Sequence, residues 1–205
     1  MQKLTKLLVG IIILISFSVG ILRIGCFMYP KNYQPAVKKY AALYDIPDSL
    51  VFSVIKAESN YKKDAVSKKG ARGLMQIMTP TGEWAAEKIG IKEFSEELLF
   101  DSDVNIEIGC YYLSYLLDLY NNETKLALAA YNAGPGNLIK WKKHVATSDP
   151  LLFLESIPSR ETRSFAERII VNYWIYRTLM GQPLLSLDKA VCGEWPNYQS
   201  MECQK

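Results

Sequence analysis

Two short stretches determine how this sequence is interpreted: Ala57-Glu58-Ser59-Asn60-Tyr61 and, a few residues later, Gly70-Ala71-Arg72-Gly73-Leu74-Met75-Gln76. The first ends a segment, residues 47–58, whose apolar residues repeat at helical spacing, so Glu58 projects from the face that packs inward. The second is interpreted as a loop, because Gly70 and Gly73 permit a positive φ or a close backbone approach. A carboxylate at a helix end that faces such a loop indicates a place for chemistry.

The composition predicts one globular domain with appendages. The chain has 205 residues, of which 49% are apolar and 22% are charged, and this is enough to bury one sizeable core. The net charge is only +3, and no basic stripe is interleaved with aromatic residues, so nucleic acid is not an expected partner. Such a charge mildly favours an anionic surface or polymer.

Histidine and cysteine residues are too few and too scattered to indicate a metal site. His144 is the only histidine, and the four cysteines form no C-x-x-C pair, so we expect neither metal nor cofactor. Cys192 and Cys203 lie close together in the sequence and can form a disulfide if the domain is exported. Cys110 falls within a helical apolar pattern and is expected to pack in the core.

The N-terminal residues predict where the domain works. Lys3 and Lys6 precede an uncharged apolar stretch, residues 7–22, which Arg23 ends. At 1.5 Å per residue the stretch is roughly 24 Å long, which suits a signal-peptide core or a short anchor whose flanking charges snorkel. Lysines before the stretch indicate that the chain begins in the cytoplasm and that the domain lies outside.

No A-x-A-like cleavage site follows the apolar stretch, which favours an uncleaved anchor over a removed signal. We therefore interpret residues 1–28 as an N-terminal anchor or uncleaved signal of a single-pass cell-membrane protein with an extracytoplasmic domain. Lipidation at Cys26 is a minor alternative, because Arg23 stands where a lipoprotein signal needs an apolar residue.

Beyond a short linker at residues 29–34, the pattern predicts helices throughout. Start and stop signals such as Thr79-Pro80, Gly90 and Ser159 divide the chain. The predicted helices cover residues 35–44, 47–58, 79–88, 102–120, 124–133, 137–143, 149–156 and 160–180. Alternation of period two is nowhere sustained, so we predict an all-α fold with at most a small strand pair within residues 67–76. Residues 182–205 form a C-terminal extension.

Four short motifs follow one another along the chain: Glu58-Ser59, Gly73-Leu74-Met75-Gln76, Ala130-Tyr131-Asn132-Ala133-Gly134, and Ile157-Pro158 followed by Glu161-Thr162-Arg163. In this order they resemble the signature of the catalytic domain of soluble lytic transglycosylases, which is related to goose-type lysozyme and to glycoside hydrolase family 23. The resemblance covers residues 35–181. It implies a helical lysozyme-like domain with a substrate cleft.

The resemblance also implies an activity. Such a domain cleaves the β-1,4 bond between N-acetylmuramic acid and N-acetylglucosamine in the glycan strands of peptidoglycan. The product carries a 1,6-anhydromuramic end, because the C6 hydroxyl of the sugar attacks in place of water. The enzyme is thus expected to be a lyase that acts on a polysaccharide. No protein partner is implied.

Glu58 matches the acid/base of the family, and the chemistry supports this role. Breaking a glycosidic bond needs a protonated carboxyl group near neutral pH, and burial can raise a pKa to about 6. Leu74 and Met75 can supply an apolar wall. Most glycosidases need a second carboxylate, but Asp64 lies in an exposed-looking charged run. A transglycosylase can dispense with it, because deprotonated Glu58 can act as base toward the substrate's own hydroxyl.

Substrate-binding roles are implied for further motif residues, and each has a structural alternative. Ser59 steadies the glutamate or contacts sugar, or it only caps the chain after the helix. Gln76 binds an N-acetyl group or positions the C6 hydroxyl, or it is a buried amide that holds its loop. Met75 is expected to pack against a sugar or to form the floor of the cleft.

Residues of the two later motifs also have a functional and a structural alternative. Tyr131 can bond Glu58 or stabilise oxocarbenium-like charge, or it can pack in the core. Asn132 binds substrate or caps a broken helix. Glu161 binds sugar or is favoured by the helix dipole alone, and Arg163 is expected in a structural ion pair. Phe165 stands where the family usually has tyrosine, so a hydroxyl that helps the acid or a sugar is missing here.

Aromatic residues near the expected cleft, namely Tyr61, Trp84 and Trp141, suit sugar stacking, although about half of them are expected in the core. Two alternatives to a lytic transglycosylase stay open. One is a hydrolytic muramidase of the same fold. The other is a non-catalytic cell-wall-binding module of an envelope machine. The intact motif set argues against this module, and the change at Phe165 keeps it open.

Overall fold

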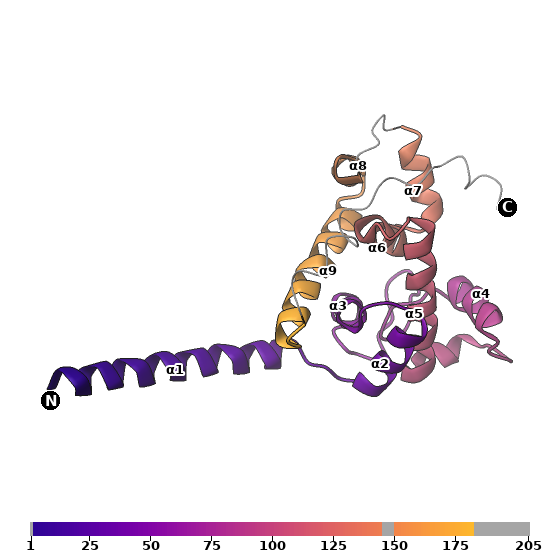
Figure 1. Cartoon of the computed structure of the whole chain (residues 1–205). Helices are drawn as coiled ribbons and strands as arrows, with labels where there is room; N and C mark the ends of the chain where they lie inside the picture. Colours follow the sequence, from indigo (N-terminus) through magenta and orange to yellow (C-terminus); the bar gives the residue numbers. More distant parts are fainter. Residues whose placement is uncertain (1, 145–149, 183–205) are drawn as a thin grey trace. The chain divides into compact units, whose positions relative to one another are not determined.

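The computed structural model describes residues 2–144 and 150–182. The chain divides into two compact units, Met1–Asn32 and Tyr33–Lys205. Helix α1 (Gln2–Met28) makes up most of the first unit (Figure 1). Within the described residues, no helix combines the length and apolar character that a membrane crossing requires. The transmembrane anchor therefore remains a prediction.

The described part of the second unit consists of helices joined by loops. Figure 1 shows α5 and α9 as its two long helices. Helix α6 packs against both of them, α3 packs against α9, and α2 and α4 pack against α5. The helices are α2 (Gln34–Leu43), α3 (Asp48–Glu58), α4 (Thr79–Ile89), the 3-10 helix η1 (Glu96–Phe100), α5 (Ser102–Leu119), α6 (Thr124–Ala133), α7 (Pro135–Lys142), α8 (Pro150–Ser156) and α9 (Arg160–Leu179).

Helix ends follow the capping signals of the sequence. The Asp101 side chain accepts hydrogen bonds from the amides of Asp103 and Val104 at the start of α5, and Ser159 accepts one from the amide of Thr162 at the start of α9. The predicted boundaries agree with the structure to within two residues. Two differences are η1, which was not predicted, and α7, which begins at Pro135 because proline suits a first helical position.

The predicted strand pair is reduced to isolated bridges. In the described residues, Arg72 forms antiparallel bridges with Val66 and with Ile77, and no strand is present. The fold class is therefore all-α, as predicted. The bridges fold residues 65–77 into a compact loop, and this loop carries the Gly-Leu-Met-Gln motif toward α5 and α6.

The core forms between α3, α5, α6 and α9. In α3, the apolar side chains without exposure are Val51, Phe52, Val54 and Ile55. Cys110 is buried, as predicted, and Cys26 is exposed. Cys192, Cys203 and the rest of residues 183–205 lie outside the described residues, so their predicted disulfide is not tested.

Candidate active site

Glu58 is the last residue of α3, at the end of a helix that packs against α9. Burial raises the pKa of Glu58 from 4.5 to about 8, the positive charge of Arg168 lowers it, and the negative charge of Glu161 raises it. Desolvation penalises the ionised form, so the carboxyl group is largely protonated at neutral pH. This is the state that a general acid needs.

Asn105 fastens the Gly-Leu-Met-Gln loop beside this acid. It is fully buried, its Oδ1 accepts a hydrogen bond of 2.8 Å from the amide of Met75, and its Nδ2 donates to the carbonyls of Leu99 and Arg72 at 2.8 and 3.1 Å. The sequence interpretation missed this residue. The only signal was an amide side chain in the buried register of an apolar helix.

Gly73 is required by the same arrangement. Its φ is +77°, and a Cβ atom there would lie 2.2 Å from the Leu99 carbonyl oxygen and 2.3 Å from Nδ2 of Asn105. No side chain fits at that distance. Gly70 also has a positive φ, +87°, but nothing lies within 4 Å of a Cβ placed there. Only the first of these glycines is therefore closed in by packing.

Tyr131 and Met75 form a packed layer next to Glu58. The Tyr131 hydroxyl donates a hydrogen bond of 2.8 Å to the Met75 carbonyl, so its proton is not directed at Glu58. Burial, and then the negative charge of Glu58, raise the pKa of Tyr131 well above its ordinary value. The Met75 side chain is fully buried and lies so close to Gly109 that a Cβ there would be 2.3 Å from its sulfur. It contributes to the floor of the site.

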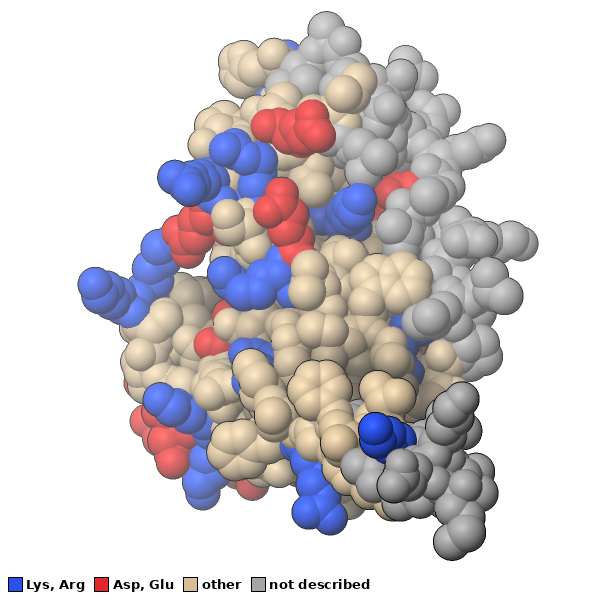
Figure 2. Space-filling view, turned by 90° about the vertical axis from the view of Figure 1, so that its left-hand side faces the viewer, with Lys and Arg blue, Asp and Glu red and all other residues tan. Residues whose placement is uncertain are grey.

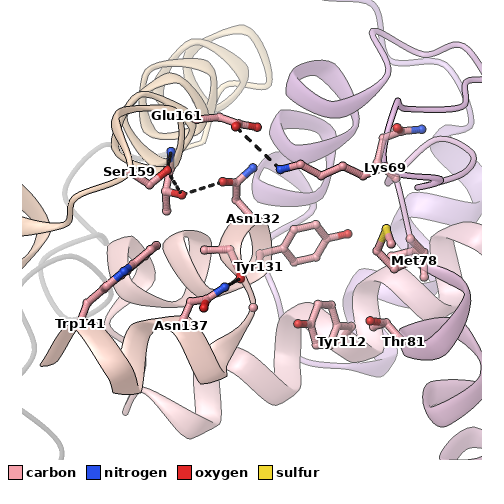
Figure 3. A pocket seen from close by; sticks show the side chains of 15 residues that line it. Lys69, Met78, Thr81, Tyr112, Tyr131, Asn132, Asn137, Trp141, Ser159 and Glu161 are labelled. Carbon is pink, nitrogen blue, oxygen red and sulfur yellow. Dashed lines mark hydrogen bonds and ion pairs between the residues drawn. The ribbon is translucent and has the colours of Figure 1, made fainter. Parts of the chain in front are cut away.

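A cavity of about 460 Å³ opens over this layer (Figure 3). Of the predicted site residues, Gln76, Tyr131, Asn132 and Glu161 line it, whereas Glu58, Ser59 and Met75 are not among its described lining residues. Glu58 lies within electrostatic range of two lining residues, Tyr131 and Glu161. The complete lining is Lys69, Gln76, Ile77, Met78, Thr81, Tyr112, Tyr131, Asn132, Ala133, Gly134, Asn137, Trp141, Ser159, Glu161 and Thr162.

Gln76 and Ser59 make the structural contacts that the sequence left as alternatives. The Gln76 Nε2 donates to the carbonyls of Ala65 and Gly73 at 3.1 and 2.9 Å, and its φ is +50°. It thus holds the loop with its amide group while it borders the cavity. The Ser59 hydroxyl donates to the Ile55 carbonyl at 3.2 Å and is buried at the end of α3.

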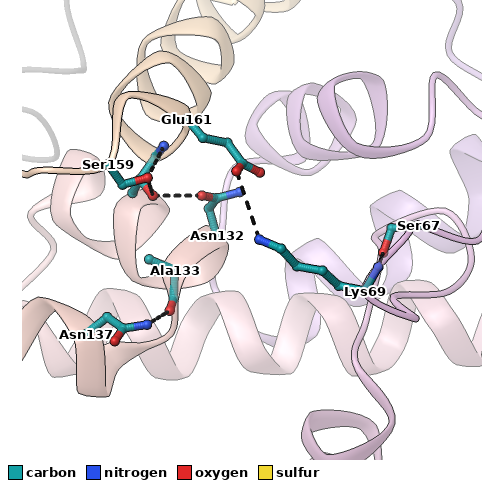
Figure 4. Close-up of polar contacts among 8 residues, drawn as sticks. Ser67, Lys69, Asn132, Ala133, Asn137, Ser159 and Glu161 are labelled. Carbon is teal, nitrogen blue, oxygen red and sulfur yellow. Dashed lines mark hydrogen bonds and ion pairs between the residues drawn. The ribbon is translucent and has the colours of Figure 1, made fainter.

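Asn132 joins the end of α6 to the start of α9 (Figure 4). Its Oδ1 accepts a hydrogen bond of 2.9 Å from the Thr162 hydroxyl, which also lies 2.9 Å from the hydroxyl of Ser159. Glu161 follows Ser159 closely, lines the cavity and is exposed. One of its carboxylate oxygens lies 3.9 Å from the Lys69 ammonium nitrogen. Arg163 donates a hydrogen bond to the Ile157 carbonyl, and among the described residues it forms no ion pair. The contact is structural, as expected, but it is not the predicted ion pair.

The aromatic residues divide between core and cavity. Tyr61 is only 8% exposed, and its hydroxyl lies 2.5 Å from that of Tyr176, so it is one of the aromatic residues that pack in the core. Trp84 packs against Tyr111 and Tyr115 of α5, whereas Trp141 lines the cavity. The sequence interpretation missed Tyr112, which also lines it.

Phe165 is 2% exposed, and its ring lies 5.9 Å from the guanidinium carbon of Arg168. The Phe165 ring is thus buried on α9 beside the Arg168 guanidinium. On the face drawn in Figure 2, basic and acidic side chains alternate, and no broad area of one charge gathers.

Comparison with known proteins shows which family has a similar sequence. Residues 35–153 match the family model described as Transglycosylase SLT domain. The chain is 35% identical over 155 residues to the soluble lytic murein transglycosylase of Escherichia coli (strain K12), covering 75% of this chain and 24% of that protein. It is 34% identical over 118 residues to the membrane-bound lytic murein transglycosylase C of Yersinia pestis (strain Pestoides F), covering 53% of this chain and 33% of that protein. It thus spans about a quarter to a third of these relatives.

Solved structures of lytic transglycosylases are similar to this chain in fold. The 70 kDa soluble lytic transglycosylase from Escherichia coli aligns with a TM-score of 0.73 at 33% identity, over 82% of this chain and 28% of that one. An inactive mutant of the lytic transglycosylase Slt from Pseudomonas aeruginosa aligns with a TM-score of 0.70 at 33% identity, over 76% of this chain and 25% of that one. The chain belongs to the family of proteins with a transglycosylase SLT domain.

Proposed function

We propose that the chain is a peptidoglycan lytic transglycosylase that cleaves the N-acetylmuramic acid–N-acetylglucosamine bond and leaves 1,6-anhydromuramic ends. The observation that carries this proposal is Glu58, a carboxyl group whose pKa burial raises to about 8, next to two residues that line a cavity of about 460 Å³. The names of the relatives supply the reaction class and the polymer.

Glu58 acts as both acid and base in this proposal. Its proton passes to the glycosidic oxygen as the bond from that oxygen to C1 of the muramic residue breaks. The resulting carboxylate then removes the proton of the C6 hydroxyl as O6 bonds to C1. Glu58 ends the cycle protonated, and no water is consumed. A second carboxylate is therefore unnecessary, in contrast to most glycosidases.

Tyr131 supports the protonated state of this acid. Because its own proton is committed to the Met75 carbonyl, the hydroxyl oxygen can only accept further hydrogen bonds. A protonated Glu58 can donate to such an acceptor, whereas a carboxylate cannot. Tyr131 is therefore proposed as an acceptor for the proton of Glu58, whose raised pKa is due to burial.

The other motif residues are proposed to bind the glycan from the cavity wall. Asn132 and Glu161 border the cavity from the junction of α6 and α9, and Gln76 borders it from the loop. Ser59 and Met75 are proposed to act indirectly. Ser59 holds the end of α3, and Met75 forms part of the floor of the site. Trp141 offers a ring face for a sugar.

Mass spectrometry of the muropeptides released from purified sacculi tests the function. The proposal expects 1,6-anhydromuramic ends in the products of the wild-type chain. Reducing ends would instead identify a hydrolytic muramidase. Binding to sacculi without released fragments would identify a non-catalytic wall-binding module, and either result would overturn the proposal.

We also propose that residues 1–28 attach the domain to the extracytoplasmic face of the cell membrane. The support is the uncharged stretch at residues 7–22 behind Lys3 and Lys6, together with similarity to a relative named membrane-bound. The full chain is expected in the membrane fraction, extractable by detergent but not by salt, and a chain lacking residues 1–28 is expected in the soluble fraction. Recovery of both chains in the soluble fraction would refute this attachment.

A further inference from the structure

The mouth of the cavity carries an ion pair that the catalytic step does not use. Lys69 and Glu161 are the charged residues in the described lining, and they approach each other from opposite walls (Figure 4). The distance between Nζ of Lys69 and Oε2 of Glu161 is 3.9 Å, and their side chains are 80% and 71% exposed. A pair that is so open to water contributes little by itself and exchanges partners easily.

The backbone on the Lys69 side is firmly held. The Ser67 hydroxyl accepts hydrogen bonds from the amides of Lys69 and Ala71, at 3.3 and 3.0 Å. The backbone adds two bonds, from the Gly70 amide to the Ser67 carbonyl at 3.0 Å and from the Ser67 amide to the Ala71 carbonyl at 2.9 Å. This closed turn fixes the point from which the long, exposed Lys69 side chain reaches toward the cavity.

The backbone on the Glu161 side is held as well. Glu161 lies in the first turn of α9, which Ser159 caps and which the bond from Thr162 to Asn132 ties to α6. Two fixed walls thus present one exposed cation and one exposed anion to the same opening (Figure 3). A ligand that carries its own carboxylate can replace Glu161 as the partner of Lys69.

We propose that Lys69 is a specificity-determining residue that binds a carboxylate carried by the glycan, outside the bond that is cleaved. This inference rests on the proposed function, because it assumes a peptidoglycan strand in the cavity. Two sources offer the same chemistry: the lactyl carboxylate of muramic residues without peptide, and the carboxylates of stem peptides where these are attached. A neutral glycan offers neither and gains nothing from Lys69.

Binding is measured by calorimetry with the full chain carrying Glu58→Gln, so that the ligand is not consumed. Lys69→Met is compared with Lys68→Met, a matched change at an exposed neighbour outside the cavity lining. The probes are peptide-free glycan strands, the same strands with their carboxyl groups converted to methylamides, and uncrosslinked strands that bear stem peptides.

Lys69→Met is expected to weaken binding of a carboxylate-bearing strand about two- to fivefold, the range for an exposed charge pair. It should leave the methylamide strand unchanged, and Lys68→Met should alter none of the three. A loss confined to peptide-free strands assigns the lactyl carboxylate, and a loss confined to peptide-bearing strands assigns the stem. A loss on both strands supports the proposal for both sources.

Three results would overturn the proposal: equal effects of Lys69→Met and Lys68→Met, an equal loss on the methylamide strand, or no binding of carboxylate-bearing strands by the parent chain. Failure of the proposed function is read separately, from the muropeptides that the wild-type chain releases. If anhydromuropeptides appear while Lys69→Met binds like its control, then Lys69 has no role in specificity and the catalytic proposal stands.

Discussion

Two carboxyl groups near the same cavity have opposite surroundings. Glu58 ends a buried helix beside Tyr131, and burial raises its pKa to about 8. Glu161 stands at the mouth, 71% exposed, beside Lys69. Because desolvation favours the neutral form of a buried acid, the packed side of the cavity holds a carboxyl group suited to donate a proton, whereas the open side holds an exposed ion pair. This difference is the basis for proposing catalysis on the packed side and recognition on the open side.

The largest expected effect separates the two carboxyl groups directly. Glu58→Gln should reduce the rate of muropeptide release about 10²- to 10⁴-fold, the usual contribution of a positioned proton donor, with an unchanged circular dichroism spectrum. Glu161→Gln should reduce it less than about tenfold, because that residue is proposed only to bind. Equal losses of rate in the two variants would contradict the different roles proposed for Glu58 and Glu161.

The two glycines of the loop make a second matched pair. Gly73→Ala should destabilise the domain by about 3 kcal/mol or more, because its Cβ would collide with the Leu99 carbonyl and Asn105 in addition to the strain of a positive φ. Gly70→Ala carries only the strain, about 1 kcal/mol. Urea unfolding of both variants measures the difference. Similar values would show that the packed side is less rigid than described.

A smaller effect is expected at Tyr131. Tyr131→Phe leaves the buried Met75 carbonyl without its donor, which should cost about 1–3 kcal/mol of stability. The resulting shift of the floor should lower activity about 10- to 100-fold. Tyr115→Phe, at an exposed position of α5, is the matched control. Wild-type activity in Tyr131→Phe would contradict a role for this hydroxyl next to Glu58.

The sequence was sufficient to predict the α-helices and the burial of Glu58. Periodicity located α3 and α9, capping residues located their ends, and the position of Glu58 after an apolar face indicated burial. These are local signals, and tertiary packing preserved them. The same reasoning left open which of Tyr61, Trp84 and Trp141 lie in the core, because periodicity does not reveal which neighbour packs against an aromatic side chain. Tyr61 is buried, and its hydroxyl meets that of Tyr176, far along the chain.

The contacts around the acid could not be predicted for a similar reason. Asn105 and Met75 are joined by a hydrogen bond between residues 30 positions apart, and Tyr131 reaches Met75 across 56 positions. The pairing of Lys69 with Glu161 likewise depends on how the loop and α9 meet. A single sequence specifies residue types at such places, but the partner of each emerges only from the packed fold.

The most direct test of this account is a titration of the Glu58 side chain by carbon-13 NMR. The signal is assigned by its absence in Glu58→Gln. The account predicts that the carboxyl carbon titrates with an apparent pKa of about 8, so that the group is mostly protonated at pH 7. The rate constant kcat/KM should then fall as the pH rises through this value, because the free enzyme loses its acid. A titration near the ordinary value of 4.5 would contradict the account, because Glu58 would be ionised and unable to donate a proton at neutral pH.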